Sequence, residues 1–377
     1  MIDQKRVRET FLRLLRMNTP SGQEGPVADF LEAELRALGF ETWRDGAGKA
    51  IGGETGNLLA RRPGSAPEAP TLLLNAHMDT VAPTEALEIV EEPDGVIRSS
   101  GTTILGADDK AGLTAILEGV RAAVAEGFPM PTVEIAFTIA EETGLRGARH
   151  LDYSSLTATQ GYAFDGGKPV GGIIVAAPSQ DNVTAVVHGV AAHAGAAPEK
   201  GVSAIRIAAE AITRMPLGRI DDETTANIGV IHGGHATNIV PDRVECRGEA
   251  RSHNDEKLAR QTRAMVDAFN QAAAAAGGRA DVRVERVYSH FGFSESDPLV
   301  RRAVTAGSRA GIAEVVTRPG GGGSDANIFN THGIATVVVG LGYDNVHAND
   351  EYMSLADLTT AARVALELLR VAGAEKA

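Results

Sequence analysis

The sequence predicts an α/β fold in which a sheet with helices on its faces is interrupted by a smaller α+β domain. Segments 72–74 and 133–140 are apolar enough for buried strands, and the amphipathic stretch between them, 113–127, predicts a helix that ends at a glycine. Strand, helix, strand in this order is typical of a sheet covered by helices. From residue 182 onward the pattern changes to βαββαβ, the order of a ferredoxin-like unit. A chain of 377 residues is also long enough for two hydrophobic cores.

The individual elements follow from hydrophobic spacing. The ferredoxin-like unit comprises strands at 183–190, 226–231, 240–250 and 282–287 and helices at 202–215 and 256–275. Beyond it we expect a helix at 298–310, a strand at 335–339 and a closing helix at 354–372. Near the start, Ser21 and Glu24 have the spacing of a capping box before a helix that ends at Gly39.

Composition excludes several classes of protein. The hydrophobic share of 43% and the charged share of 23% are those of a globular chain. A net charge of -13 argues against nucleic-acid binding, which needs clustered cations. No segment has the roughly 20 apolar residues of a membrane span. The single Cys246 cannot form an internal disulfide, which favours a cytoplasmic location.

Residues of metal-ligand type stand at or near the ends of predicted strands. His77 and Asp79 follow the strand at 72–74, and a His-x-Asp pair allows the acid to hold one imidazole nitrogen while the other meets a metal. Asp108 begins a helix beside a second aspartate, where acids also serve as caps. Glu141 and Glu142 follow the strand at 133–140, where a solvated charge pair is the alternative.

Two further ligand-type residues come later in the chain. Asp165 ends an apolar run and could merely start a turn, and His347 follows the strand at 335–339. Alone, each of these residues fits a structural role. Together, three carboxylates and two imidazoles at strand ends predict a site for two divalent ions that share one carboxylate. Zinc is the leading metal, with cobalt and manganese as alternatives.

These segments, in this order, resemble the co-catalytic zinc aminopeptidase and carboxypeptidase family that contains peptidase T, glutamate carboxypeptidase and succinyl-diaminopimelate desuccinylase. The resemblance runs almost end to end and implies a zinc-peptidase catalytic domain with a central mixed sheet flanked by helices. It also implies that His77, Asp108 and Asp165 hold one ion and that Asp108, Glu142 and His347 hold the other. Asp108 would then be the bridge, joined to its neighbour by a cis peptide bond.

The same resemblance assigns the remaining roles. Glu141 would be the general base and Asp79 would orient a metal-bound histidine. In the inserted domain, His193 resembles the histidine that stabilises the oxyanion, with a loop histidine as the plain alternative. Asn238 and Arg251 match positions that grip a substrate carboxylate, although Arg251 could instead form a surface salt bridge.

The resemblance also gives the domain plan. It implies a catalytic domain in two parts, 1–180 and 289–377, and a lid and dimerisation domain at 181–288. The glycine-rich loop 320–325 lacks the lysine of a phosphate-binding loop. The resemblance implies instead that this loop lies beside the active site and that the backbone of Gly322 binds substrate. Many relatives pair through the lid, so a homodimer is one expectation, with His193 acting in its own site or in its partner's.

The expected activity is metal-dependent hydrolysis of an amide bond in short peptides, of the tripeptide aminopeptidase type. The stretch between His77 and Asp108 is shorter than in tripeptidases proper, so the chain is described as peptidase T-like rather than as a tripeptidase. A carboxypeptidase or N-acyl-amino-acid amidohydrolase is the alternative among enzymes. A non-catalytic peptide-binding homologue is the alternative of another class, and Glu141 argues against it.

Overall fold

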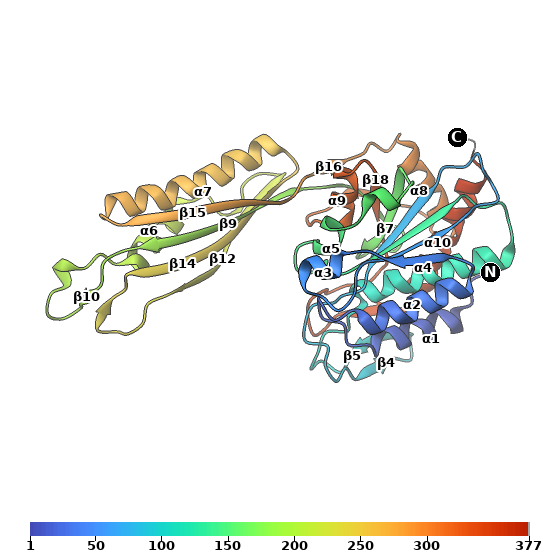
Figure 1. Cartoon of the computed structure of the whole chain (residues 1–377), viewed down its shortest axis with the longest axis horizontal. Helices are drawn as coiled ribbons and strands as arrows, with labels where there is room; N and C mark the ends of the chain where they lie inside the picture. Colours follow the sequence, from blue (N-terminus) through green and yellow to red (C-terminus); the bar gives the residue numbers. More distant parts are fainter. Residues whose placement is uncertain (376–377) are drawn as a thin grey trace. The chain divides into compact units, whose positions relative to one another are not determined.

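The computed structural model describes residues 1–375, which form two compact units (Figure 1). The discontinuous unit consists of Met1–Ala176, Gly292–Gly320 and the chain from Ser324 onward. The inserted unit consists of Ala177–Phe291 together with Gly321–Gly323. None of the helices in the described part of the chain combines the length and apolar character that a membrane span requires.

A nine-stranded mixed sheet forms the centre of the discontinuous unit, with strand order β1-β2-β6-β3-β7-β18-β8-β16 and with β17 paired to β8. The strands are β1 Glu41–Arg44, β2 Leu58–Arg62, β3 Leu72–His77, β6 Val133–Thr138, β7 Gln160–Gly166, β8 Ile173–Ala177, β16 Phe291–Gly292, β17 Thr317–Pro319 and β18 Ala335–Gly340. The four central strands, β6, β3, β7 and β18, are parallel neighbours, so their carboxyl ends meet at one edge. The expected mixed sheet is thereby confirmed.

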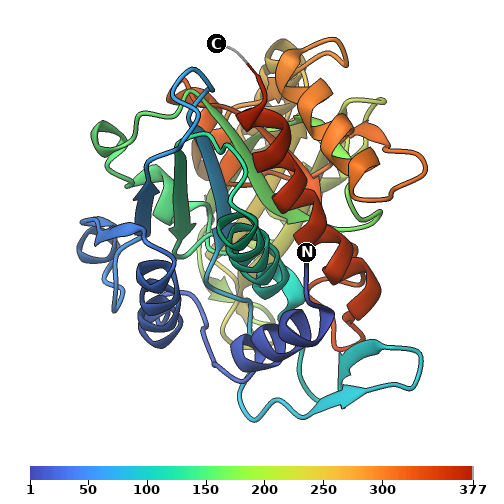
Figure 2. The same ribbon diagram turned by 90° about the vertical axis from the view of Figure 1, so that its right-hand side faces the viewer.

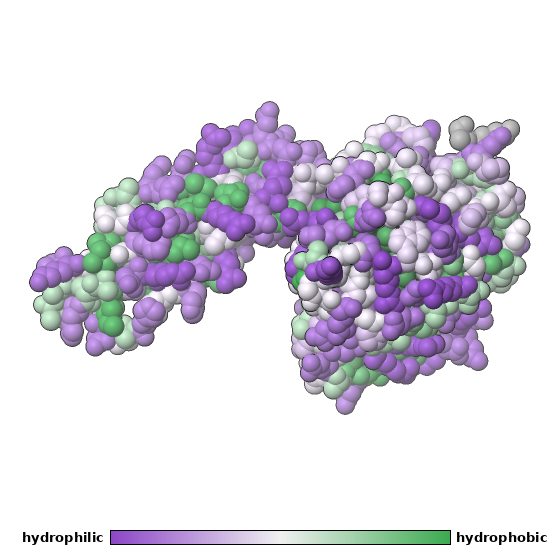
Figure 3. Space-filling view, viewed as in Figure 1, coloured by the Kyte–Doolittle hydropathy of each residue, from purple (hydrophilic) through white to green (hydrophobic). Residues whose placement is uncertain are grey.

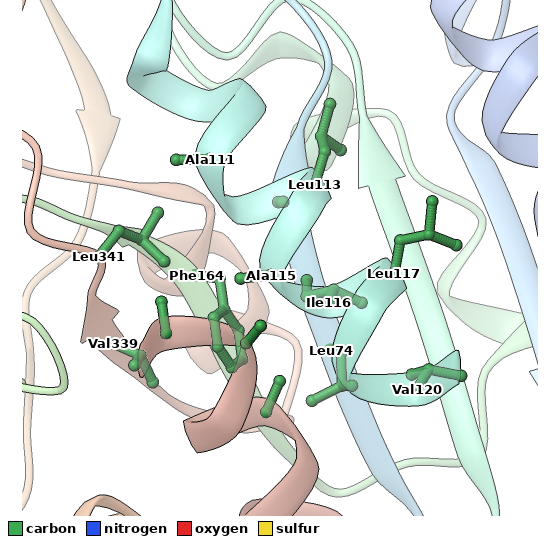
Figure 4. Packing of buried hydrophobic residues seen from close by; sticks show 14 of the residues in the cluster. Leu74, Ala111, Leu113, Ala115, Ile116, Leu117, Val120, Phe164, Val339 and Leu341 are labelled. Atoms are coloured by element: carbon green, nitrogen blue, oxygen red, sulfur yellow. The ribbon is translucent and has the colours of Figure 1, made fainter. Parts of the chain in front are cut away.

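Helices cover both faces of this sheet (Figure 2). The helices of the discontinuous unit are α1 Gln4–Leu15, α2 Gly25–Ala37, α3 Ala47–Ile51, α4 Ala107–Glu126, α5 Arg146–Arg149, α8 Pro298–Arg309, α9 Asp325–Thr331 and α10 Leu355–Gly373, with a 3₁₀ turn at Tyr153–Ser155. Helix α4 packs against α10 and against the sheet, and its apolar side chains meet Leu74, Phe164 and Val339 of three neighbouring strands (Figure 4). Successive strand residues serve opposite faces, because Leu72 and Leu74 join this core while Leu73 packs with Phe329 of α9.

The inserted unit has the strand order β11-β12-β14-β9-β15, and every neighbouring pair is antiparallel. Its elements are β9 Ser179–His188, α6 Ala204–Arg214, β11 Gly218–Arg219, β12 Thr224–Gly233, β14 Arg243–Ser252, α7 Asp255–Ala275 and β15 Arg279–Tyr288. Without the short β11, the order is that of the predicted ferredoxin-like unit. Both helices pack on one face of the sheet around Val187, Cys246 and Phe269.

Small elements complete the chain. A three-stranded sheet joins β4 Ile89–Glu91, β5 Val96–Ser99 and β19 Tyr352–Ser354, and a two-stranded pair joins β10 Ala192–His193 to β13 Ile239–Val240. A 3₁₀ turn lies at Pro198–Lys200.

One local prediction is wrong. Ser21 and Glu24 do not form a capping box, because α2 begins at Gly25 and receives no hydrogen bond from a capping side chain. The Ser21 hydroxyl instead donates to Asp79 Oδ2 over 2.5 Å. The side chain of Glu24 accepts from the amides of Gly22 and Ala140. Both side chains therefore serve tertiary contacts at the sheet edge.

Candidate metal centre

The carboxyl edge of the parallel strands gathers the ligand-type residues that the sequence singles out. His77 is the last residue of β3, Glu141 and Glu142 follow β6, and Asp165 lies near the end of β7. His347 belongs to the loop after β18. Open α/β sheets place ligand sites at this edge because loops from neighbouring strands meet there.

His77 is oriented so that one ring nitrogen faces carboxylates. Its Nδ1 lies 2.9 Å from the backbone carbonyl oxygen of Asp79, which can only accept, so Nδ1 carries the proton. The sequence predicted that the Asp79 carboxylate would hold this nitrogen, but the carboxylate lies farther from Nδ1, at 3.4 Å. Nε2 lies 3.1 Å from Asp108 Oδ1 and 3.7 Å from Asp165 Oδ1.

Asp108 lies between the two histidines. His77 Nε2 approaches its Oδ1, while His347 Nε2 lies 3.4 Å from its Oδ2 and 3.0 Å from Glu142 Oε1. A carboxylate with one imidazole at each oxygen has the arrangement of a bridging ligand. The peptide bond from Asp108 to Asp109 is cis, as the resemblance implied.

Asp109 is the alternative donor in this part of the site. Its carboxylate lies close enough to the His77 imidazole and the Asp165 carboxylate for the three side chains to form a ligand group. However, Asp109 Oδ2 accepts the backbone amide of His77 over 3.1 Å and Oδ1 accepts that of Gly112 over 3.0 Å. Because both oxygens of Asp109 already accept backbone amides, we expect Asp108 rather than Asp109 to bind a metal ion.

The electrostatics show that the cluster lacks positive charge. Burial opposes the charged form of His77, but hydrogen bonds to Asp108 and Asp79 and nearby carboxylates raise the pKa of His77 well above 6.5. Hydrogen bonds to Asp108 and Glu142 raise the pKa of His347 to about 10. Burial, together with the charge of Asp108, also raises the pKa of Asp165 well above 3.8. The two histidines and Asp165 retain protons because several carboxylates crowd together in the cluster.

The donor set fits metal ions. At bond lengths of about 2.0–2.1 Å, donors arranged tetrahedrally around zinc lie about 3.3 Å apart. The contacts among the nitrogen and oxygen donors of this cluster span 3.0 to 3.7 Å. When Nε2 of His77 or His347 carries no proton, its lone pair faces a carboxylate and needs a cation between the two. A divalent ion would supply more positive charge at that point than a proton does.

Two further polar side chains, which were not predicted from the sequence, lie beside the cluster. The Glu351 carboxylate, fully buried, accepts from the amides of Gly106 (2.7 Å) and Asp108 (3.1 Å). The Tyr343 hydroxyl lies 3.3 Å from Asp108 Oδ1 and 3.5 Å from Asp165 Oδ1. The only sequence signal for either was proximity to His347, since burial cannot be read from a polar residue type.

A cavity of about 310 Å³ opens beside the cluster within the discontinuous unit. Asp108, Asp165 and Tyr343 form one part of its lining, and Lys168 and Arg318 form another. The cavity therefore offers space for a small ligand next to the carboxylates.

The remaining predicted residues lie in the inserted unit, in two groups. His193 is on β10, where its Nδ1 accepts the amides of Gly195 (3.1 Å) and Ala196 (3.0 Å), and Asn238 directly precedes the partner strand β13. Nδ1 therefore carries no proton in the neutral ring, and Nε2–H is left as a donor.

Arg251 and Gly322 form the other group. A methyl group placed on Gly322 would lie 3.7 Å from an Arg251 guanidinium nitrogen. The same guanidinium makes a two-pronged bond to Glu249, at 2.9 and 3.0 Å, which is the salt bridge given above as the alternative. On β14, Arg251 pairs with Gln180 of β9, whereas His188 of β9 pairs with Arg243. Eight strand residues separate these two positions, about 26 Å, so the two groups lie at opposite ends of the unit.

The fold and the cluster define a class, an α/β protein with a central mixed sheet and a candidate metal site at the sheet edge, and comparison with known proteins identifies the family. Residues 73–371 match the model of peptidase family M20/M25/M40, so the chain belongs to that family. It is a peptide hydrolase of the peptidase T-like kind.

Three relatives illustrate the similarity. A tripeptidase from Staphylococcus aureus subsp. aureus mu50 has a structure that matches with a TM-score of 0.95 at 40% identity, covering 100% of both chains. The aminopeptidase PepT from Bacillus cereus ATCC 10987 matches with a TM-score of 0.89 at 41% identity, covering 98% of this chain and 99% of its own. The uncharacterized protein YqjE from Bacillus subtilis (strain 168) is 42% identical over 99% of this chain and 100% of its own length.

Proposed function

We propose that the protein is a two-metal exopeptidase that hydrolyses an amide bond of short peptides, releasing an N-terminal residue from tripeptide-like substrates. The observation that carries this proposal is the position of Asp108 between two imidazoles, with Asp165 and Glu142 on either side. The names of the tripeptidase and of the aminopeptidase PepT, each about 40% identical over nearly the whole chain, support the substrate class.

The proposal divides the ligands between two ions. His77, Asp108 and Asp165 hold one, and Asp108, Glu142 and His347 hold the other. Zinc is preferred because imidazole and carboxylate donors at these spacings suit it, with cobalt or manganese as alternatives. When bound, a pair of such ions polarises the scissile carbonyl and makes water a nucleophile near neutral pH.

Glu141 is the proposed general base. It takes a proton from the attacking water and delivers it to the leaving nitrogen. Burial and the charges of Asp165, Asp325 and Glu142 raise the pKa of Glu141 well above 4.5, which suits a group that must hold a proton during turnover. Asp79 orients His77 through its backbone carbonyl and fixes the backbone that carries Glu141.

The inserted unit is the proposed lid, spanning 181–288, and supplies substrate contacts. His193 Nε2–H would donate to the oxyanion, a task for which its tautomer is already set. Asn238, Arg251 and the backbone of Gly322 would bind the ends of the substrate. Because His193 and Arg251 lie at opposite ends of one inserted unit, we propose that each serves a different active site of a homodimer.

The surface of the inserted unit is compatible with such a dimer. Its exposed large hydrophobic residues include Val190, Val230, Ile231, Ile239 and Val284. Figure 3 shows hydrophobic side chains on the inserted unit among hydrophilic ones. The proposal includes no nucleic-acid or membrane partner and, given the single, buried Cys246, places the enzyme in the cytoplasm.

A substrate panel tests the proposed activity. Purified protein is stripped of metal, supplied with zinc, cobalt or manganese, and assayed with tripeptides, N-blocked tripeptides and N-acyl amino acids. We expect metal-dependent cleavage of tripeptides with a free amino terminus. Cleavage confined to N-acylated substrates would instead establish the carboxypeptidase or amidohydrolase alternative, and binding without cleavage would establish a peptide-binding homologue.

A further inference from the structure

The turn at 139–142, which carries Glu141 and Glu142, is held by side chains through four consecutive backbone amides. The first amide donates to Asn57 Oδ1 over 3.1 Å and the second to Glu24 Oε1 over 3.0 Å. The third and fourth donate to the two carboxylate oxygens of Asp79, over 3.0 and 3.2 Å. Strand β6 ends at Thr138, so sheet pairing does not orient this turn.

The acceptors are buried and are themselves held in place. Glu24, Asn57 and Asp79 each have no exposed surface. Glu24 Oε1 also accepts the amide of Gly22 over 2.8 Å. Asn57 Nδ2 donates to Asp45 Oδ2 (2.8 Å) and to a backbone carbonyl (2.9 Å), which directs Oδ1 toward the turn. Each acceptor therefore has a fixed position before it binds an amide.

The turn needs this support because its backbone is strained. Ala140 has a φ of 49°, in the left-handed region that residues with a Cβ rarely adopt. A strained conformation persists only where its surroundings determine it more strongly than its own preference. The amide of Ala140 is the one that Glu24 accepts.

We propose that Glu24, Asn57 and Ser21 are positioning residues for the peptidase reaction, forming a clamp that fixes where Glu141 and Glu142 project. Ser21 acts through Asp79, to whose Oδ2 its hydroxyl donates over 2.5 Å. The clamp rests on the proposed function, since it matters for catalysis only if the turn carries the general base and a metal ligand. A small displacement of either carboxylate lowers the rate because the reacting groups must be held within a fraction of an ångström.

Glu24 offers the sharpest test. Glu24→Leu removes the acceptor and keeps an apolar side chain of similar size. Glu24→Gln keeps a carbonyl oxygen that can make both bonds of Oε1, and Oε2 has no hydrogen-bond partner among the described residues. A clamp therefore predicts opposite outcomes for two substitutions that both remove the charge.

The readouts separate positioning from a general loss of stability. With saturating metal, Glu24→Leu should lower kcat by at least about tenfold while KM changes by less than about twofold, and Glu24→Gln should restore most of the loss. Hydrogen exchange measured by mass spectrometry should be faster at 139–142 in Glu24→Leu than in the wild type. The control is Glu118→Leu, which removes another fully buried acid, on α4, and should destabilise the fold without accelerating exchange at 139–142.

Several results would overturn the clamp. One is an unchanged kcat in Glu24→Leu, and another is an equal fall of kcat in Glu24→Leu and Glu24→Gln. A third is hydrogen exchange at 139–142 that is no faster in Glu24→Leu than in Glu118→Leu. If Glu24→Leu does not fold, Ser21→Ala takes its place, with the same slower turnover and faster exchange expected. If the wild type cleaves no peptide, the proposed function fails, while the exchange rates still decide whether the clamp exists.

Discussion

Replacement of Glu141 by Gln isolates the proposed proton transfer from the proposed metal binding. The Gln side chain has nearly the same shape but cannot take a proton. The backbone amide of residue 141 still donates to Asp79 Oδ1, at 3.0 Å in the wild type, so the turn keeps its position. The carboxylate of Glu141 also belongs to neither donor group that could hold an ion, so both ions should remain.

The size of the effect follows from the role. General base catalysis contributes about 10²–10⁴-fold to a rate, so kcat should fall by that factor. This fall corresponds to about 2.7–5.4 kcal/mol of transition-state stabilisation at about 1.36 kcal/mol per tenfold change. KM should change little because Glu141 acts on the attacking water rather than on substrate binding.

The assay compares initial rates of tripeptide cleavage with metal content measured on the same samples. Glu68→Gln is the matched control, because Glu68 is exposed and precedes the first residue of β3, at the opposite end of that strand from His77. Turnover by Glu141→Gln at the level of Glu68→Gln would remove Glu141 from the mechanism. Loss of one metal equivalent would show that Glu141 is a ligand instead.

Three further predictions concern the scaffold and the lid. Glu134→Leu removes a fully buried acid that accepts hydrogen bonds from an arginine and from two backbone amides. Urea unfolding should show that the free energy of unfolding falls by about 3 kcal/mol, and a fall below about 1 kcal/mol would contradict this prediction. A methyl group on Gly112 would lie 2.1 Å from a carbonyl oxygen of β7, whereas one on Gly46 would meet nothing within 4 Å. Gly112→Ala should therefore weaken the retention of zinc against a chelator, and the control Gly46→Ala should not. His193→Ala should lower kcat by about 10²–10³-fold. If His193 serves the partner's site, mixing and refolding His193→Ala with His347→Ala chains should restore about a quarter of wild-type activity, and no recovery would place His193 in its own chain's site.

The long periodic elements could be predicted from the sequence. The spacing of the apolar residues in α4 and the glycine at its end predicted that helix, and Gly127 adopts the positive φ of 66° expected of such a cap. The βαββαβ order of the inserted unit was equally clear, since each of its elements is long. By contrast, β1, β2 and α9 were not singled out, because short elements held mainly by tertiary packing carry little pattern of their own.

The candidate site divides in the same way. His77, Glu142 and Asp165 could be placed together because parallel neighbouring strands end at one edge. The roles of Ser21 and Glu24 could not be foreseen. Their spacing fits a capping box, yet their hydrogen bonds reach partners 58 and 116 residues away. A local sequence pattern predicts only local hydrogen bonds. Here Ser21 and Glu24 bind distant partners instead, because the buried Asp79 carboxylate and the buried Ala140 amide lie within reach.

The most direct test is metal analysis of the purified chain. After incubation with zinc and exhaustive dialysis, we expect two equivalents per chain by mass spectrometry of the metal, and none in the His77→Ala, His347→Ala double variant. The control is a His188→Ala, His290→Ala double variant in the inserted unit, which should keep both equivalents. Two equivalents retained without His77 and His347, or none retained by the wild type, would contradict the two-metal centre.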